Sequence, residues 1–551
     1  MIAVASLLVS AQLVAATIDV NNGDNLFDTL QGLQAGDEVI VHAGTYPVPG
    51  FVNLVLSGTE NAPIIIRAAD GDEVIIAGID SQNAINVEGS WYTLRGLKVV
   101  GGSHGVRLGS SSHATIEGLE ITETGDVGIS CNRPDNTYEA LTIRGNHIHH
   151  TGMGGGPGEC MYLGCNDDGC QMWDSVIEFN WCHDTTAGSQ GDGIEVKTGS
   201  YNNLIRHNVI HDVKYPGITI YGTVDNKAPN VVEGNAVWNV VDNGIQTVGD
   251  AIVRNNLVFD VGANGIHAKP SQGEIVELID IVHNTIINPG GVCLRGNEWP
   301  GGDGIVVADN AFYCPGGTAI KLPSGAGSAT IDSNAVVGGV EGAPMGTFDG
   351  VSVDAAFIDA GAKDVYPKGD SPLVDAGAAG HAELDFNCLP RDPNGVEVGA
   401  YDLSDAQNPG WAVGPGFKTC ADGGDSDGTT TGDSDGSTGG ETTGDATDGT
   451  TGAPTTGDTT DGTTGDASTG TTGGDGTGSS GGDSSTGSAT GDATATATAG
   501  SATAGSATTG DAMEDDEEGC ACHVDAQTSS PRGLALFALA GLIAFGRRRR
   551  E

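Results

Sequence analysis

The run Gly191-Asp-Gly-Ile-Glu-Val-Lys-Thr198 carries the densest group of chemically useful side chains in the sequence. Its alternation is typical of a strand and puts Glu195 and Lys197 on the same face. Asp192 and, from the preceding repeat, Glu159 are expected beside them. Removing a proton next to a carboxylate needs a base and a group that neutralises the growing negative charge. A lysine beside carboxylates that hold Ca²⁺ can meet both needs.

Polar side chains recur at the matching positions of the following repeats. If the repeats stack as strands, these side chains form two adjoining columns, which is the geometry of a groove for an extended chain such as a polysaccharide. Alignment of the repeats puts Glu195, Gln246 and His267 in one column and Lys269 beside Arg295 in the other, and the columns predict substrate-binding roles for these five residues. The alternative is an ordinary solvated sheet, whose outward residues are polar without any ligand.

Two other groups are weaker candidates for ligand binding. His149, His183 and His211 share one register in three successive repeats, and apolar residues continue their column. This pattern indicates a packing ladder, with a metal site as the alternative. The acidic turn between Cys165 and Cys170 is either a Ca²⁺ loop or a hairpin closed by a local disulfide.

The elements that would position these residues are set by an internal repeat around asparagine. The repeated asparagines are separated by 34, 28, 27, 21, 28, 26 and 24 residues, and they are Asn146, Asn180, Asn208, Asn235, Asn256, Asn284, Asn310 and Asn334. A second strand begins with Gly-Ile or Gly-Val in most repeats, as at Gly193 and Gly217. Short strands in repeats of irregular length predict an all-β protein built as a right-handed parallel β-helix. Each asparagine is expected to hold a left-handed turn and to bond to its copy in the next coil.

The N-terminal part of the chain supports this architecture. The segment Phe27-Asp-Thr-Leu-Gln-Gly-Leu33 predicts a short amphipathic helix that caps the open edge of the coil. The segments 33–46 and 57–67 resemble the opening of the chondroitinase B and alginate lyase group, polysaccharide lyase family six, within the pectin-lyase-like superfamily. The resemblance runs from about Thr17 to Leu403 and implies a β-helix that acts on polysaccharide.

The same resemblance suggests roles within the dense patch. Residues 158–164 resemble the family's Gly-Glu-x-Ile-x-Ile-Gly motif, and Asp192 and Lys197 have the spacing of its calcium-binding acid and catalytic lysine. The resemblance therefore implies that Lys197 is the base and Asp192 a metal ligand. Glu159 is expected on the neighbouring coil with little positive charge nearby, so Glu159 and Asp192 together predict a Ca²⁺ site.

The sequence departs from the family pattern at three places. Gln190 stands where the family has a second acid, and the stretch 152–156 replaces a calcium-binding asparagine. Tyr221 lies about where the family has its catalytic arginine, and it is the predicted proton donor in its place. These departures leave three functions open. They are a Ca²⁺-assisted lyase that cleaves uronate-containing chains by β-elimination, a non-catalytic glycan-binding or surface-adhesion protein, and a glycoside hydrolase that pairs Asp192 with another carboxylate.

Charge excludes one broad class of partner. The formal net charge of the chain is −50, and residues 1–420 alone hold 18 Lys and Arg against 51 Asp and Glu, a net charge of −33. A nucleic-acid-binding protein needs a basic face to neutralise phosphates, so nucleic acid is not an expected partner.

The two ends of the chain predict export. Residues 1–16 are a short apolar run that ends in small residues, typical of a signal peptide, so the nine cysteines between Cys131 and Cys420 can form disulfides. The β-helix domain is expected over 17–420 and a disordered linker rich in Gly, Thr, Asp and Ser over 421–511.

The last part of the chain, 512–551, contains Cys520, Cys522, an apolar stretch at 533–546 and four terminal arginines. This ending resembles the sorting tails called MYXO-CTERM, which implies processing by a sorting machinery and attachment to the membrane. The expected location is the cell surface or the outer membrane.

Overall fold

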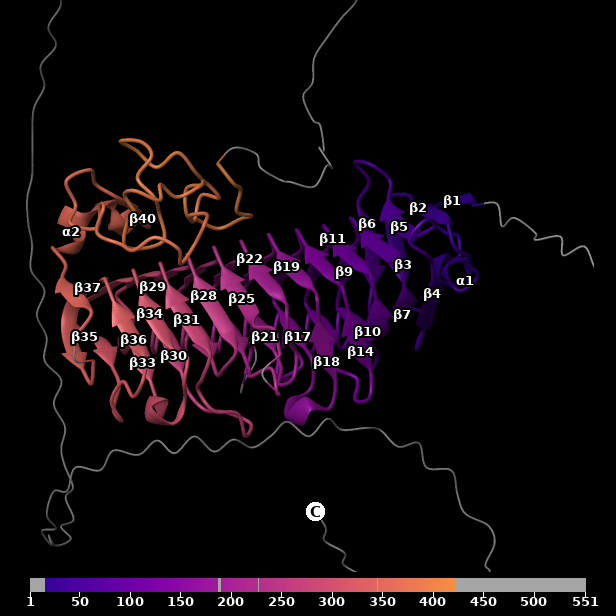
Figure 1. Ribbon diagram of the computed structural model, residues 1–551. Helices are drawn as coiled ribbons and strands as arrows, with labels where there is room; N and C mark the ends of the chain where they lie inside the picture. Colours follow the sequence, from indigo (N-terminus) through magenta and orange to yellow (C-terminus); the bar gives the residue numbers. More distant parts are fainter. Residues whose placement is uncertain (1–14, 187–189, 226, 344, 422–551) are drawn as a thin grey trace, which may run out of the picture. The chain divides into compact units, whose positions relative to one another are not determined.

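Three parallel ladders of short strands form the coil of this protein (Figure 1). The computed structural model describes residues 15–186, 190–225, 227–343 and 345–421. After the first turn, which holds β1 alone, the turns of the coil contribute a strand to each ladder, and each strand pairs in parallel with its counterpart in the next turn. The predicted all-β fold with parallel β-helix sheets is confirmed.

The strands of the first ladder are β1 (Thr17–Val20), β2 (Glu38–Val41), β5 (Ile64–Ala68), β8 (Tyr92–Arg95), β11 (Thr115–Glu117), β15 (Thr142–Arg144), β19 (Val176–Glu178), β22 (Leu204–Arg206), β25 (Asn230–Glu233), β28 (Ala251–Arg254), β31 (Ile279–Val282), β34 (Val306–Ala308) and β36 (Thr330–Asp332). The strands of the second ladder are β3 (Gly44–Pro47), β6 (Val74–Ala77), β9 (Lys98–Val100), β12 (Glu120–Thr122), β16 (His147–His149), β20 (Trp181–His183), β23 (Val209–His211), β26 (Ala236–Trp238), β29 (Leu257–Phe259), β32 (Thr285–Ile287), β35 (Ala311–Lys321), β37 (Asn334–Glu341) and β38 (Thr347–Asp349).

The strands of the third ladder are β4 (Asn53–Ser57), β7 (Ile85–Ser90), β10 (Val106–Ser112), β13 (Ile129–Cys131), β17 (Met161–Leu163), β21 (Ile194–Val196), β24 (Ile218–Ile220), β27 (Ile245–Thr247), β30 (Ile266–Ala268) and β33 (Val292–Gly296). Strands β14 (Thr137–Glu139) and β18 (Gln171–Trp173) extend from β10. The long strand β35 continues both the second and the third ladders.

The repeated asparagines form a buried ladder between the first and second ladders of strands. Asn208 is representative: its Nδ2 donates to the Ile177 carbonyl at 2.9 Å and to Asn235 Oδ1 at 3.0 Å. Its own Oδ1 accepts from the backbone N–H of Asn180 at 3.0 Å and from that residue's Nδ2 at 2.9 Å. The predicted bonding from coil to coil is confirmed.

The left-handed turn lies one residue earlier than predicted. The residues that precede the asparagines have the positive φ, for example His207 at 56° and His283 at 53°. The side-chain amide fixes the turn because it bonds to backbone groups of the preceding coil and to the asparagine side chain of the next coil. The asparagine itself therefore does not need the left-handed conformation that the sequence pattern suggested.

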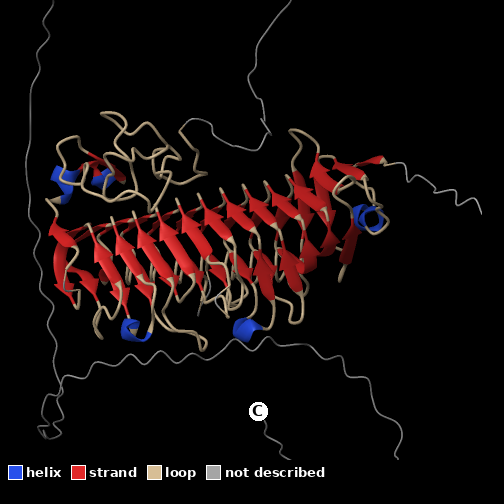
Figure 2. Ribbon diagram, in the orientation of Figure 1, coloured by secondary structure: helices blue, strands red, loops and turns tan. Residues whose placement is uncertain are grey.

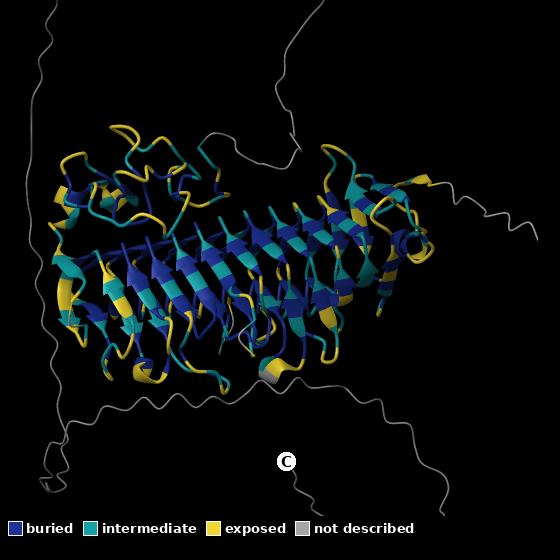
Figure 3. Ribbon diagram, viewed as in Figure 1, coloured by how far each residue is buried: buried dark blue, intermediate teal, exposed yellow. Residues whose placement is uncertain are grey.

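Close approach between coils explains the glycine that begins many strands of the third ladder. A Cβ on Gly193 would lie 2.4 Å from the Gly217 carbonyl oxygen, and a Cβ on Gly217 would lie 2.8 Å from that of Gly244. The isoleucine that follows each glycine points inward and is fully buried. The pattern Gly-Ile therefore marks where each coil packs against the next, and the inner faces form one continuous apolar core (Figure 3).

After β38 the chain leaves the coil and folds back along it (Figure 2). Residues 353–421, which we call the C-terminal segment, contain α2 (Val353–Ala356), β39 (Phe357–Asp359), the 3₁₀ turn Ala360–Ala362 and β40 (Asp364–Pro367). They cover the outer face of the second ladder and form a second apolar core with it. Leu373, Val398 and Tyr401 are buried in that core, so the segment closes the side of the coil.

The predicted N-terminal helix is present as α1 (Leu26–Leu30), shorter than the expected Phe27–Leu33, and it buries Leu26, Phe27 and Leu30. No helix in the described part of the chain has the length and apolarity needed to cross a membrane. The predicted signal peptide, the linker after Ala421 and the sorting tail with its 533–546 segment lie outside the described residues.

Candidate functional site

The side chains predicted to do chemistry meet on three neighbouring strands of the third ladder. In the strand register, Tyr162 of β17 lies beside Glu195 of β21, and Glu195 lies beside Thr219 of β24. Glu159 and Asp192 each come two residues before their strand begins. The parallel register therefore brings the acids of two coils to one place, as the repeat alignment predicted.

Three carboxylates form the centre of this site. Glu159, Asp192 and Glu195 each offer an oxygen, and the three oxygens lie within 4.8 Å of one another. Asp192 Oδ1 accepts a hydrogen bond from Thr219 Oγ1 at 2.7 Å. Within the described residues, both oxygens of Glu159 and Oε2 of Glu195 are buried without a hydrogen-bond partner. Glu195, predicted to bind substrate, therefore belongs to the carboxylate cluster.

Burial makes this cluster electrostatically costly. Burial raises the pKa of Glu159 well above its usual range, and the nearby charges of Glu195 and Asp192 raise it further. Burial and the charge of Glu195 raise the pKa of Asp192 in the same way, although the hydrogen bond from Thr219 opposes this. The site consequently favours either protons on these carboxylates or a cation between them.

Lys197 is the cation that the described residues place in the cluster. Its Nζ lies 2.5 Å from Glu195 Oε1, 4.6 Å from the centre of the Tyr162 ring and 4.9 Å from that of Tyr221. Tyr221 donates to the same Glu195 oxygen at 3.3 Å. Burial, Glu195 and Asp192 raise the pKa of Tyr221, so its hydroxyl keeps the proton.

The outward face at this site is buried, whereas the sequence suggested an open groove. Lys197 and Glu195 are each 4% exposed. The turns after the third ladder meet nearby: Thr198 donates to Gln272 at 2.5 Å, and Gln272 donates to Asn166 at 3.1 Å. Long turns from separate coils thus enclose side chains that strand alternation alone places toward solvent.

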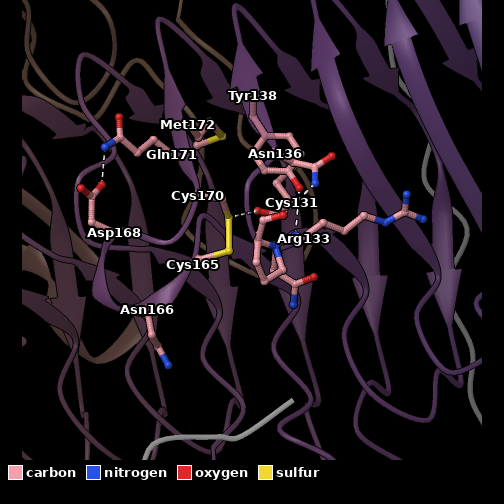
Figure 4. Close-up of a disulfide and its surroundings, with 12 residues drawn as sticks. Cys131, Arg133, Asn136, Tyr138, Cys165, Asn166, Asp168, Cys170, Gln171 and Met172 are labelled. Carbon is pink, nitrogen blue, oxygen red and sulfur yellow. Dashed lines mark hydrogen bonds between the residues drawn. A yellow bond between two sulfur atoms is a disulfide. The ribbon is translucent and has the colours of Figure 1, made fainter. Parts of the chain in front are cut away.

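A disulfide holds one of these turns (Figure 4). Cys165 and Cys170 are bonded around the 3₁₀ turn Asn166–Asp168, which confirms the stapled hairpin. Asn166 Oδ1 accepts from the Tyr162 hydroxyl at 3.3 Å. Three more disulfides join Cys160 to Cys182, Cys293 to Cys314 and Cys388 to Cys420, and among the described residues Cys131 is a buried free thiol.

The other predicted substrate-binding residues follow further along the third ladder. Gln246 lies beside Thr219, and His267 lies beside Gln246. Burial lowers the pKa of His267 to about 3, helped by Lys269 and Arg295, so its ring is neutral. The third ladder therefore carries these residues in coils beyond the carboxylate cluster.

Arg295 occupies a different register from the one that the sequence alignment gave. It pairs with His267, whereas the alignment placed it beside Lys269. A two-residue slip preserves the inward and outward alternation, so the hydrophobic pattern does not distinguish the two registers. The structure settles the register through Gly265, whose N–H donates to the Val292 carbonyl at 2.9 Å.

The histidine column behaves as a packing ladder. The rings of His149 and His183 stack at 5.1 Å, those of His183 and His211 at 4.9 Å, and His211 stacks on Trp238 at 4.7 Å. This confirms the packing interpretation.

Comparisons with known proteins agree with this architecture. A family model described as "Right handed beta helix region" matches residues 83–224 and 158–314, and one described as "Chondroitinase B" matches residues 20–122. The second match ends before the carboxylate cluster begins. No curated protein matches the chain.

Several solved structures are similar at low identity. An alginate lyase from Paenibacillus sp. str. FPU-7 has 22% identity and a TM-score of 0.40, with 47% of this chain and 93% of that chain covered. XylC in complex with xylose has 12% identity and a TM-score of 0.49, over 71% and 99%. The PL6 family alginate lyase AlyGC has 16% identity and a TM-score of 0.43, over 64% and 56%. From the family match and the strand ladders together, the coil over residues 83–314 is a right-handed β-helix.

Proposed function

We propose that this protein is a Ca²⁺-assisted polysaccharide lyase that cleaves uronate-containing chains by β-elimination. One observation carries the proposal: three buried carboxylates lie together, and among the described residues the one lysine beside them, Lys197, forms an ion pair with Glu195 alone. The chondroitinase B match over residues 20–122 and the sequence resemblance of the coil support a polysaccharide as substrate.

The donor set of the cluster fits calcium. Ca²⁺ takes carboxylate and other oxygen ligands. Glu159, Asp192 and Glu195 would hold the ion, and the unpaired oxygens of Glu159 and Glu195 are the groups that gain most from it. When bound, Ca²⁺ would offset the charge of the substrate carboxylate as negative charge grows on the neighbouring carbon.

Lys197 and Tyr221 would move the protons. In β-elimination the proton on the carbon next to the uronate carboxylate passes to Lys197 Nζ, and the electron pair left behind forms the new double bond. The glycosidic oxygen leaves with a proton from the Tyr221 hydroxyl. Lys197 forms an ion pair with Glu195, so its role as base requires that Glu195 serve as a metal ligand instead.

Product formation tests the proposal directly. The full chain should release unsaturated uronate products, detected by their ultraviolet absorbance, from at least one of alginate, pectate and glycosaminoglycans. Calcium should be required, so a chelator should stop the reaction and added Ca²⁺ should restore it. If no member of this panel is cleaved in the presence of Ca²⁺, the proposal is contradicted.

Calcium binding should also change the pH dependence of stability. The pKa values of Glu159 and Asp192 are raised in the folded state, so the unfolded chain loses these protons first as pH rises above about 4. In a chelator the melting temperature should therefore fall from pH 5 to pH 8. Ca²⁺ at a hundred times its Kd should add about 2.7 kcal/mol at pH 8 and less at pH 5.

Two aspartate variants separate this effect from nonspecific ion binding. Asp192→Asn should reduce both the fall with pH and the gain from Ca²⁺. Asp250→Asn is the matched control, because Asp250 is also buried and accepts a hydrogen bond from Thr223 at 2.6 Å. Equal Ca²⁺ responses in the two variants would place the ion elsewhere.

The burial of Lys197 favours a second candidate, a non-catalytic glycan-binding protein. In this reading Lys197, which is 4% exposed, paired with Glu195 and held between two tyrosine rings, stabilises the third ladder and has no catalytic role. Binding of a panel glycan without any cleavage would support this alternative.

Export to the cell surface, with the C-terminal tail as membrane anchor, is part of the proposal. The four disulfides of the described chain support it, because such bonds persist mainly outside the cytosol.

A further inference from the structure

A second group of metal-ligating side chains lies where the C-terminal segment meets the coil. His283 and Asp309 occupy the same position in consecutive coils, each directly before an asparagine of the buried ladder. His381 comes from the C-terminal segment and contacts both. Three residues that are far apart in the sequence thus converge on one point outside the carboxylate cluster.

The distances suit a small metal ion. Asp309 Oδ2 lies 2.7 Å from His381 Nδ1 and 3.5 Å from His283 Nε2, and the three ligand atoms are within 4.8 Å of one another. Ligands at about 2.0–2.1 Å from a tetrahedral zinc ion are about 3.3 Å apart. Small movements of the His381 side chain, which is one-third exposed, would reach this geometry.

His283 supplies an independent sign of a missing ligand. Its side chain is 1% exposed, and among the described residues neither ring nitrogen makes a hydrogen bond of good distance and angle, although the backbone of Glu397 and of Gly399 lies nearby. A buried imidazole whose nitrogens make no well-formed hydrogen bond has a lone pair available for a metal ion.

The surroundings of Asp309 orient it for the same role. Its Oδ1 accepts the backbone N–H of Ala378 at 2.9 Å, which leaves Oδ2 facing the two histidines. Metal-binding carboxylates are commonly held by such bonds. The nearby positive charge of Arg391 is paired with Asp402, whose Oδ1 lies 3.9 Å from Nη1.

We propose that His283, Asp309 and His381 bind a divalent transition metal ion such as Zn²⁺ and that this ion fastens the C-terminal segment to the coil. Two imidazole nitrogens and one carboxylate oxygen favour zinc over calcium. Three protein ligands leave a fourth position for water.

Cobalt and zinc binding to the full chain test this site. Another group of metal-ligating side chains lies elsewhere on the coil: His147 Nε2 and His183 Nε2 are 2.8 Å apart, and Glu120 is close to His147. Metal binding by this group must be removed from the measurement. The measurements therefore use a background with His147→Ala and His183→Ala. In that background Co²⁺ should give the visible absorption of a four-coordinate site, and Zn²⁺ should displace it and raise the melting temperature.

His381→Ala should weaken Zn²⁺ binding by at least about 100-fold, since loss of outer-shell partners alone costs 10–100-fold. Asp309→Asn, which keeps the side-chain shape, should weaken it as well. The control is His113→Ala. His113 stacks on Trp91 and is distant in sequence from the three proposed ligands, so this variant should bind Zn²⁺ as tightly as the background. Unchanged zinc affinity in His381→Ala, or no zinc binding by the background protein, would overturn the proposal.

Discussion

Lys197→Arg is expected to reduce the turnover of a cleaved polysaccharide by about 10²–10⁴-fold, the usual contribution of a general base. Arginine keeps the positive charge opposite Glu195, but a guanidinium does not give up its proton in proteins. The variant therefore isolates the base role from the ion pair. Its melting temperature with Ca²⁺ and its affinity for glycan should stay near those of the wild type.

The control is Lys227→Ala. Lys227 also lies over a tyrosine ring, with Nζ 4.6 Å from the centre of Tyr201, but its hydrogen bond goes to Gln171. This variant should cleave at the wild-type rate. Wild-type turnover in Lys197→Arg would show that Lys197 is not the base, even if the protein is a lyase.

Asn208→Ala should have the largest effect on stability. The change removes two donated and two accepted hydrogen bonds at a fully buried position. It leaves the Ile177 carbonyl and the Asn180 N–H without their side-chain partner. Each buried group without a partner costs about 1–3 kcal/mol, so a loss of about 3 kcal/mol or more is expected. Denaturant unfolding monitored by circular dichroism measures it.

Asn61→Ala provides the comparison, because Asn61 is exposed in the turn before β5. That variant should unfold within about 0.5 kcal/mol of the wild type. Similar midpoints for the two variants would mean that the asparagine ladder adds little to stability.

The fold could be predicted because two residue types, asparagine and glycine, recur at positions where the coil requires them. Asparagine recurs where a side chain must bond to two neighbouring coils. Glycine recurs where the backbones of two coils come close together, as at Gly193 and Gly217. Sequence spacing also placed Asp192 and Lys197 in one site, since Asp192 lies one residue before Gly193 and Lys197 three residues after Ile194.

Other features depend on contacts that no local pattern encodes. The register of Arg295 was uncertain because a slip of two residues buries the same face. Gln272, which bonds to Thr198 next to Lys197, is distant in sequence and belongs to a turn of variable length. His283 has no partner in its own repeat, and its neighbour His381 follows about a hundred residues later, so that pairing had no sequence signal.

The return of the C-terminal segment along the coil also bears on how the protein unfolds. A solenoid held only by neighbouring repeats can lose its coils one at a time from an end. The C-terminal segment packs against residues from Val209 to Ala335, and it is bonded to several coils at once, for example through Lys418 to Gly234 and through Ala400 to Thr285. These coils should therefore open as one cooperative unit, with similar protection of their amides from hydrogen exchange. The coils before Asn146 lie outside that second core and should exchange sooner, so the molecule would open from its N-terminal end.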